Sequence, residues 1–314
     1  MKKFIQNRLR TLASSHDRDI ESCVVLQCLS AVHMNRRKNR IRYLADVEFC
    51  GFSQWGEDGV IDWLLEKLPG IPETFVEFGV EDYRESNTRL LLFLRNWRGL
   101  VMDGSDAHVR RIQAQDIYWR YDLTAKCAFI ERENINKLIA SSGMQGDIGL
   151  LSVDIDGNDY WIWQAIDVVR PIVVVCEYNA VFGDLHRISV PYQPDFQRTR
   201  VHHSNLYFGA SLPALIHLGE QKGYRFVGTN SNGCNAFFVR EDHAAAVVGA
   251  LDEARSYPSR FREGRDASGQ LTFARGAERV SVIRHLPVVD FSTGQLRPLM
   301  ELGDLYSPAW LSAQ

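Results

Sequence analysis

The stretch Phe75-Val-Glu-Phe-Gly-Val-Glu-Asp82, followed after a helix-length gap by Gly99-Leu-Val-Met-Asp-Gly104, decides the fold of this chain. It has the pattern of a buried strand, a glycine turn, a helix and a second buried strand that ends on an acid. In an open α/β sheet, ligands bind beyond the carboxyl ends of the strands, next to the turn after the first strand. We therefore expect a cofactor over Gly79, because a residue without a Cβ lets the backbone come close to it.

The acid at the end of the second strand, Asp103, can accept hydrogen bonds from both hydroxyls of a ribose. It follows Glu77 by 26 positions, more than the roughly 20 residues of the dinucleotide fingerprint, and only one glycine of G-x-G-x-x-G is present. A pyrophosphate would have no cradle, which disfavours a nicotinamide oxidoreductase. A nucleoside without phosphates fits better, and S-adenosylmethionine is the commonest cofactor of that kind.

Composition excludes several classes of protein. The chain has 314 residues and a net charge of −3, so it can bury a full core and has no charge suited to a nucleic acid or an anionic membrane. It contains no apolar run long enough to span a membrane or to act as a signal peptide. Its six cysteines have no paired spacing, which indicates a reducing compartment. We expect a cytoplasmic protein without membrane insertion.

Three segments follow from the pattern along the chain. Residues 1–48 are expected to form an N-terminal helical arm, 49–243 the cofactor-binding domain, and 244–314 an extension packed on the core. The arm favours a homo-oligomer, dimeric or larger. In the domain, Ser53 is expected to cap the first helix, and strands alternate with helices to give a mostly parallel sheet with an antiparallel edge strand. The expected strands cover residues 75–79, 99–103, a short one ending near 121–122, 149–154, 172–177, 224–228 and 235–240.

Acids crowd the ends of the fourth and fifth strands of the series. Asp154, Asp156 and Asp159 follow one strand, and Glu177 ends the next, with Asn179 two residues on. Crowded carboxylates repel one another and need a cation, a proton or a donor. Asp154, Asp156, Glu177 and Asn179 are therefore a candidate Mg²⁺ site. The alternative is structural: a turn at Asp156, a helix cap, and a loop oriented by Asp154.

Histidines are the expected proton acceptors, because their pKa lies near working pH. His186, His202 and His203 all lie in an irregular segment, residues 179–208, that faces the strand ends. Each one is also a common kind of surface histidine. Tyrosines in the same segment offer faces for a sugar ring or anchors for the loop.

Four blocks of the sequence, in this order, resemble the FkbM-type class I methyltransferases. They are Ser53-Gln-Trp-Gly-Glu-Asp58, Phe75-Val-Glu-Phe-Gly79, Trp97-Arg-Gly-Leu-Val-Met-Asp103 and Ser152-Val-Asp-Ile-Asp-Gly157. The resemblance covers roughly residues 50–240. It implies a Rossmann-like α/β fold with a seven-stranded sheet, S-adenosylmethionine as cofactor, and O-methylation of a sugar or natural-product hydroxyl.

The resemblance also implies site residues, together with the reading of the strand ends. The cofactor loop would hold Glu77 and Gly79, the ribose would bind Asp103, and Asp122 would meet the adenine amino group. The expected cofactor contacts are Gln54, Glu77, Gly79, Asn87, Asp103, Gly104, Ser105, Asp122 and Asp154.

In the expected mechanism a metal orients the acceptor hydroxyls, and His202, His203, His186 or Asp154 serves catalysis. Two other functions stay open. A metal-dependent glycosyltransferase would use Asp154-x-Asp156 to hold the diphosphate of a nucleotide sugar. A non-catalytic protein would bind the cofactor without turnover.

Overall fold

Seven strands form the central sheet of the computed structural model, which describes residues 2–313 and the side chains of residues 18–313. Their order is β3-β2-β1-β4-β5-β8-β7. The strands are β1 (Thr74–Phe78), β2 (Arg98–Asp103), β3 (Leu123–Cys127), β4 (Gly146–Val153), β5 (Val169–Glu177), β7 (Tyr224–Thr229) and β8 (Asn235–Arg240). The first five run parallel, and β8 runs antiparallel to both of its neighbours, β5 and β7. This is the Rossmann-like α/β sheet that the sequence predicted, with the antiparallel pair β7 and β8 at one edge.

The middle of the sheet is apolar because helices cover both of its faces. Residues 75–78 and 150–153 of β1 and β4 are fully buried, as is normal for parallel strands between two helical layers. The chain leaves β1 for β2 on one side and later returns to β4 on the other. Such a reversal opens a crevice at the carboxyl ends of the strands, where ligands bind in open α/β sheets.

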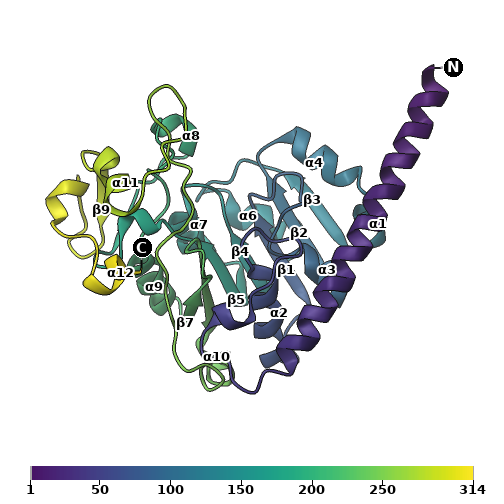
Figure 1. Ribbon diagram of the computed structural model, residues 1–314, viewed down its shortest axis with the longest axis horizontal. Helices are drawn as coiled ribbons and strands as arrows, with labels where there is room; N and C mark the ends of the chain where they lie inside the picture. Colours follow the sequence, from purple (N-terminus) through teal and green to yellow (C-terminus); the bar gives the residue numbers. More distant parts are fainter. Residues whose placement is uncertain (1, 314) are drawn as a thin grey trace.

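Two layers of helices sandwich the sheet (Figure 1). One apolar cluster joins the sheet to α2 (Glu57–Lys67), α3 (Arg89–Arg95), α4 (Asp106–Gln113), α5 (Asp116–Arg120) and α10 (Glu241–Val248). A second cluster joins the opposite face to α6 (Ile135–Ala140), α7 (Asp159–Ala165) and α9 (Leu212–Gln221). The helix expected from Ser53 begins later, at Glu57, and Gly56 is its cap residue. The Ser53 hydroxyl still accepts the backbone N–H of Asp58 (3.0 Å).

The N-terminal arm is one long helix, α1 (Lys2–Arg36), followed by the short turn η1 (Leu44–Val47). Figure 1 shows the N-terminal part of α1 projecting away from the core. Its C-terminal part packs Cys28 against Phe52 and Leu90. The buried Arg89 of α3 pairs with Glu21 on the same helix. The arm is therefore docked on the α3 side of the core.

The C-terminal segment forms a second small unit with the irregular segment at residues 179–211. A three-stranded sheet joins β6 (Ile188–Ser189), β9 (Pro287–Asp290) and β10 (Gln295–Pro298). The remaining elements there are η2 (Ala180–Phe182), α8 (Arg198–Val201), α11 (Gly276–Ile283), η3 (Leu299–Leu302) and α12 (Pro308–Ser312). A third apolar cluster holds the two segments together. The irregular segment, which was expected to cover the site, is therefore held in place by residues about a hundred positions later in the chain.

Among the described residues, no helix has both the length and the apolar character needed to cross a bilayer.

Candidate functional site

Two adjoining pockets open at the carboxyl ends of β1, β2, β4 and β5. The first has a volume of ≈ 270 Å³ and lies over β1, β2 and β4. The second, of ≈ 530 Å³, lies over β1, β4 and β5 and reaches the C-terminal segment. Both are lined by Gly79, Glu81, Asp154 and Asp156. A ligand in one pocket would therefore meet a ligand in the other at these four residues.

Gly79 sits where the loop after β1 crosses the end of β4. Its φ is +72°, in the left-handed region, and a Cβ there would overlap the backbone carbonyl oxygen of Asp154. The sequence predicted a glycine that makes room for a cofactor. The structure shows that it first makes room for the neighbouring strand end, and both pockets meet at this crossing.

Asp103 ends β2, as the sequence predicted, and it lines the first pocket. Its carboxylate accepts the backbone N–H groups of Glu81 (2.8 Å) and Ser105 (2.7 Å), and His108 Nδ1 lies 3.1 Å from it. These contacts fix the orientation of the carboxylate and leave lone pairs for a further donor. Gly104 also lines the pocket, whereas Ser105 caps α4 by accepting the N–H of His108.

Apolar side chains form part of the first pocket. Met102 comes from the end of β2, and Phe129 and Ile130 come from the chain after β3. An acid that can hold hydroxyls beside an apolar slot is suited to a nucleoside. The sequence reading did not include Met102, Phe129 or Ile130, because nothing in their local pattern separates them from ordinary core residues.

Glu77 is a buried carboxylate that holds the loop after β1. It accepts hydrogen bonds from Ser86 Oγ (3.0 Å), from the backbone N–H of Asn87 (2.8 Å), and from both the N–H and the hydroxyl of Thr88. Burial raises its pKa, and these donors oppose the rise. Asn87 in turn donates to Ser152 Oγ (3.1 Å). Glu77 and Asn87 both line the second pocket, but their main contacts are within the protein.

The prediction that Asp122 binds adenine is wrong. Asp122 immediately precedes β3, which begins at Leu123. It therefore lies at the amino ends of the parallel strands, whereas both pockets open at their carboxyl ends. Its side chain is 70% exposed and lies 3.7 Å from Arg98. The sequence reading ended a strand at this point, whereas the short helix α5 occupies the preceding residues.

The block Ser53-Gln-Trp-Gly-Glu-Asp58 builds one wall of the second pocket. The buried carboxylate of Asp58 accepts the N–H groups of three successive residues, 51–53. The buried carboxylate of Glu57 accepts Trp55 N–H (2.8 Å), Asn230 Nδ2 (2.7 Å) and Asn235 Nδ2 (2.9 Å). Both acids are architectural. Gln54, expected at the cofactor, lines this pocket with an exposed side chain.

Three carboxylates meet at the ends of β4 and β5, and two of them, Asp154 and Glu177, line the second pocket. One oxygen from each of Asp154, Asp159 and Glu177 lies within 4.8 Å of the others. Asp159 accepts the backbone N–H groups of Ile155 (2.8 Å) and Gly157 (2.9 Å). Within the described residues, Glu177 Oε2 is buried without a hydrogen-bond partner.

The pKa values of this group follow from burial and mutual repulsion. Burial, followed by the charges of Asp156 and Asp159, raises the pKa of Asp154 well above its usual value. Burial, followed by the charge of Asp154, does the same for Glu177. Burial also raises the pKa of Asp159 to about 6. Three acids in this state need protons or a positive partner.

Of the four residues predicted to bind Mg²⁺, only Asp154 and Glu177 belong to this group. Asn179 lies outside it because its side chain is fully used: it accepts the N–H of Val181 (3.0 Å) and donates to the carbonyls of Leu206 and Phe208 (2.9 Å each). Asp156 also lies outside it.

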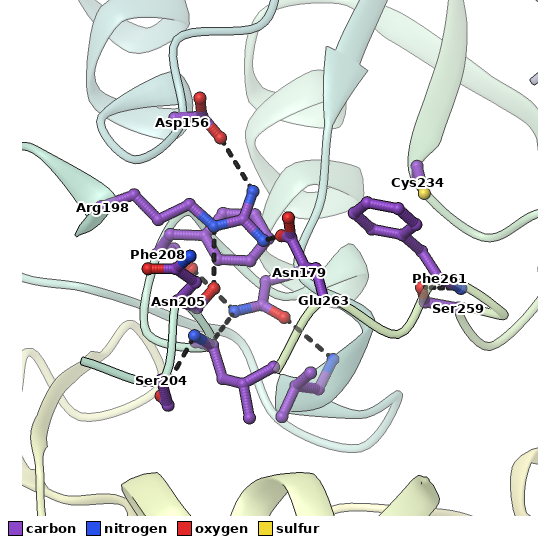
Figure 2. Close-up of polar contacts among 12 residues, drawn as sticks. Asp156, Asn179, Arg198, Ser204, Asn205, Phe208, Cys234, Ser259, Phe261 and Glu263 are labelled. Carbon is purple, nitrogen blue, oxygen red and sulfur yellow. Dashed lines mark hydrogen bonds and ion pairs between the residues drawn. The ribbon is translucent and has the colours of Figure 1, made fainter. Parts of the chain in front are cut away.

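Asp156 turns to Arg198, a residue that the sequence reading missed (Figure 2). Arg198 donates to Asp156 Oδ1 (2.8 Å) and to the carbonyl of Asn205 (2.8 Å), and it pairs with Glu263 of the C-terminal segment. Its guanidinium carbon lies 3.7 Å from the ring centroid of Phe208. Arg198 thus joins the end of β4 to both covering segments. No local sequence signal indicates such a link, because its partners are far apart in the chain.

The structure does not place the predicted catalytic histidines at the pockets. The ring of His186 bonds through Nε2 to the carbonyl of Asp304 (2.8 Å). The rings of His202 and His203 pack against each other at a tilt of 36° (4.2 Å between centroids), and the ring of His285 lies 6.0 Å from that of His202. None of these histidines lines either pocket. The irregular segment folds onto the C-terminal unit, and this turns them away from the strand ends.

The structure places three further residues in the second pocket, Trp55, Phe261 and Asn235, which the sequence did not assign to a site. The rings of Trp55 and Phe261 are tilted at 59° to each other, with centroids 5.5 Å apart. Asn235 lies opposite Glu177 in the pairing of β8 with β5 and is only 5% exposed. Trp55 belongs to a block that the sequence reading quoted, but the position of its partner Phe261 had no signal.

No family model matches this chain, and no curated protein matches it. Among solved structures, it is similar to the N-terminal domain of EvdMO1 with SAH bound (11% identity, TM-score 0.39, covering 59% of this chain and 80% of that one). It is also similar to an S-adenosylmethionine-dependent methyltransferase from Clostridium acetobutylicum ATCC 824 (9%, 0.36, 59% and 90%). A third is the O-methyltransferase from Bacillus cereus in complex with SAH (9%, 0.36, 69% and 89%). These similarities are too weak to assign a function.

Proposed function

We propose that this protein is an S-adenosylmethionine-dependent O-methyltransferase. The observation that carries the proposal is the pair of adjoining pockets at the carboxyl edge of the sheet, which share Gly79, Glu81, Asp154 and Asp156. One pocket suits a nucleoside and the other a polar acceptor. Methyl transfer needs two ligands that touch at one point in a site that excludes water.

In this proposal the first pocket holds the adenosine. Asp103, oriented by two backbone donors, accepts hydrogen bonds from the ribose hydroxyls. Met102, Phe129 and Ile130 cover the adenine. The carboxylates at the junction of the pockets are complementary to the positive sulfonium. Gln54 and Asn87, on the wall of the second pocket, remain candidates for the amino-acid end of the cofactor.

Asp154 is the proposed proton acceptor in place of the histidines. It is shared by both pockets, so it lies where the acceptor oxygen would meet the methyl group. Burial and the neighbouring carboxylates raise its pKa, and a carboxylate with a raised pKa is a stronger general base than an ordinary one. A hydroxyl acceptor needs such a base, because it loses its proton as the methyl group arrives.

The proposed acceptor is a hydroxylated ring such as a sugar or a glycosylated natural product. Support comes from the second pocket, which has a volume of ≈ 530 Å³ and is lined by polar groups and by the aromatic residues Trp55 and Phe261. Aromatic faces and hydrogen-bonding groups together suit the two kinds of surface on a sugar ring. EvdMO1 was crystallised in the presence of SAH and D-fucose, but its similarity to this chain carries no weight here.

We propose that a positively charged group neutralises Asp154 and Glu177. Mg²⁺, which the sequence predicted, is one candidate for this group. Asp159 would be its third ligand, because Asp156 and Asn179 lie elsewhere. Bound there, it would orient the acceptor oxygen and lower the pKa of its hydroxyl. Loss of activity with a chelator, restored by Mg²⁺, would identify that carrier. Activity that ignores the chelator would exclude it.

The glycosyltransferase alternative loses its main support. Asp154 and Asp156 would have to hold one metal together, but Asp156 turns to Arg198 while Asp154 faces Glu177 and Asp159. A cofactor-binding protein without turnover stays the second candidate.

The first test is calorimetric titration with S-adenosylhomocysteine, with UDP and NAD as controls. We expect micromolar binding of S-adenosylhomocysteine alone. Binding of UDP that depends on Mg²⁺, without S-adenosylhomocysteine binding, would contradict the proposal. Binding of S-adenosylhomocysteine without methylation of any acceptor in a broad screen would favour the non-catalytic alternative.

We also propose that the protein is a homo-oligomer through α1. The exposed part of this helix carries the apolar side chains Ile20, Leu26, Leu29 and Met34, which are 38–64% exposed. Light scattering on the full-length protein would measure its mass in solution. A mass equal to one chain at all concentrations would contradict this assignment.

A further inference from the structure

The second pocket has an excess of negative charge that the protein does not neutralise. Its lining includes eight acidic residues and two arginines. Arg198 is already used by Asp156 and Glu263, and Arg84 lies near Asp82 (3.9 Å). The eight acids are Glu77, Glu81, Asp82, Glu85, Asp154, Asp156, Glu177 and Glu263. Glu77, Asp82, Asp156 and Glu263 have donors or cations within the protein, and Glu81 and Glu85 are exposed. Among the described residues of this pocket, Asp154 and Glu177 therefore remain as the half-buried acids without a cationic partner.

Glu177 and Asn235 form an acceptor pair on one face of the sheet. They are directly opposite in the antiparallel pairing of β5 and β8, so their side chains point the same way. In the described part of the chain, Glu177 Oε2 and Asn235 Oδ1 are both buried without a hydrogen-bond donor. The amide of Asn235 cannot turn to supply one, because Glu57 accepts a hydrogen bond from its Nδ2 (2.9 Å). A ligand that donates several hydrogen bonds would satisfy both residues.

An aromatic pair lines the same pocket. The rings of Trp55 and Phe261 are tilted at 59° with centroids 5.5 Å apart. A cation is attracted to the face of tryptophan or phenylalanine. An organic ammonium gains from carboxylates, amide oxygen and rings together. Mg²⁺ keeps its waters and prefers six oxygens, and two of its predicted ligands lie elsewhere, so the observations favour the ammonium.

We propose that the acceptor carries a protonated amine near the hydroxyl that is methylated, and that Glu177 and Asn235 bind this ammonium group between the acidic floor and the Trp55–Phe261 wall. This inference rests on the proposed methyltransferase function and adds the chemical class of the acceptor. Trp55 Nε1, which is buried without an acceptor among the described residues, is available to a hydroxyl of the same ligand.

The reaction then assigns different roles to the two acids. The acceptor oxygen forms a bond to the methyl carbon while the bond between that carbon and sulfur breaks. The electron pair of the broken bond stays on sulfur and gives S-adenosylhomocysteine. The hydroxyl proton passes to the carboxylate of Asp154. Glu177 keeps its charge throughout and holds the ammonium group.

The test compares probes that differ in charge at one position. Full-length protein saturated with S-adenosylhomocysteine is titrated with D-glucosamine, D-glucose and N-acetyl-D-glucosamine, in EDTA and separately in Mg²⁺. We expect D-glucosamine to bind roughly tenfold more tightly than either neutral sugar in EDTA, the effect of one charge-assisted hydrogen bond. Equal responses to the three probes, including no response to any of them, would overturn the proposal.

Two variants show whether the preference comes from the assigned residues. Glu177→Gln is expected to reduce the preference for D-glucosamine to within about twofold while S-adenosylhomocysteine still binds. Asp122→Asn changes an exposed acid at the amino ends of the strands, away from both pockets, and is expected to leave the preference unchanged. A preference that survives Glu177→Gln would overturn the proposal, as would neutral sugars binding well only in Mg²⁺, which would place the metal at this pair.

The failure of this inference can be told apart from the failure of the proposed function. Loss of the amine preference with intact S-adenosylhomocysteine binding removes only the acceptor class. Failure of the parent protein to bind S-adenosylhomocysteine removes the methyltransferase proposal itself.

Discussion

The two halves of the site treat their acids in opposite ways. The proposed cofactor side comprises the first pocket and the loop after β1, and there Glu77 and Asp103 are surrounded by hydrogen-bond donors from nearby residues or from the adjoining loop. The proposed acceptor side is the acidic floor of the second pocket, where Asp154 and Glu177 lie close together with raised pKa values and few donors. The first half is complete without a ligand, and the second half is not.

This difference has an energetic meaning. A satisfied buried carboxylate stabilises its loop, so the cofactor side is a rigid and preorganised surface. Carboxylates that repel one another destabilise the fold unless a cation or a proton neutralises them. The acceptor side therefore stores unfavourable energy that a cationic ligand would release. The following predictions test this contrast, beginning with the largest expected effect.

Asp154→Asn is expected to lower kcat by about 10²–10⁴-fold, the usual contribution of a general base. Binding of S-adenosylhomocysteine should change little, because Asp103 and the apolar residues hold the nucleoside. Turnover is measured by transfer of a labelled methyl group to the acceptor found by screening. The same substitution at the exposed Asp122 is the control, and equal turnover in both variants would remove Asp154 from catalysis.

Gly79→Ala is expected to destabilise the protein by about 3 kcal/mol, measured by urea unfolding. The new Cβ would meet the carbonyl oxygen of Asp154 in addition to the strain of a positive φ. Gly70→Ala is a matched control, since Gly70 has a similar φ (+78°) but no atom within 4 Å of the position of its Cβ. A similar loss in both variants would show that the contact between β1 and β4 contributes nothing beyond strain.

Asp103→Ala is expected to weaken binding of S-adenosylhomocysteine by roughly 10–100-fold, as expected for the loss of hydrogen bonds to a charged group. Calorimetry measures the affinity. Asp122→Ala should leave this affinity unchanged, because the side chain of Asp122 is exposed and lies beside Arg98 at the amino ends of the strands. An unchanged affinity in Asp103→Ala would contradict the ribose assignment.

Glu177→Gln is expected to stabilise the ligand-free protein at neutral pH, with Tm raised by about 2 °C. The pKa of Glu177 is raised in the folded state, so the folded protein binds more protons than the unfolded one, and stability falls as pH rises. This decline begins near the ordinary carboxyl pKa of about 4 and continues upward, through about 6 for Asp159. Thermal unfolding across this range should give a shallower decline in the variant. An identical decline would show that Glu177 is not strained.

His202→Ala is expected to have the smallest effect, with kcat within about twofold of the parent protein. Its ring contacts His203 and Ser204 and lines neither pocket. Burial and the neighbouring histidines lower its pKa. A base must also lie within reach of the acceptor hydroxyl, and His202 lies outside both pockets. His203→Ala serves as the parallel control. A loss of about 100-fold in either variant would restore a histidine base and weaken the contrast between the two halves.

Sequence reasoning reached the cofactor side better than the acceptor side. The pattern around Gly79 and Asp103 predicted two neighbouring strands and the acid at the end of the second, because these features depend on residues close in the chain. Asp154 and Glu177 were also predicted to lie together. The prediction that Asn179 and Asp156 join this group was wrong, because Asn179 bonds within its own loop and Asp156 pairs with Arg198.

The histidines were misplaced for a similar reason. Sequence position put His202 and His203 in a segment that follows β5 and so faces the strand ends. The segment is instead held by β9 and the third apolar cluster, which are formed from residues near the C-terminus. Packing against a distant part of the chain decided which way these side chains point.

The sequence alone predicted the seven strands, the glycine turn at Gly79 and the acids at the carboxyl ends of the strands. It could do so because strand and helix periodicity, glycine turns and strand-end residues are local properties that the backbone geometry imposes. Only the tertiary structure decided which acids have partners, which side chains wall the second pocket, and where Trp55 meets Phe261. Those facts depend on burial and on charges brought together from remote segments, and no local pattern encodes them.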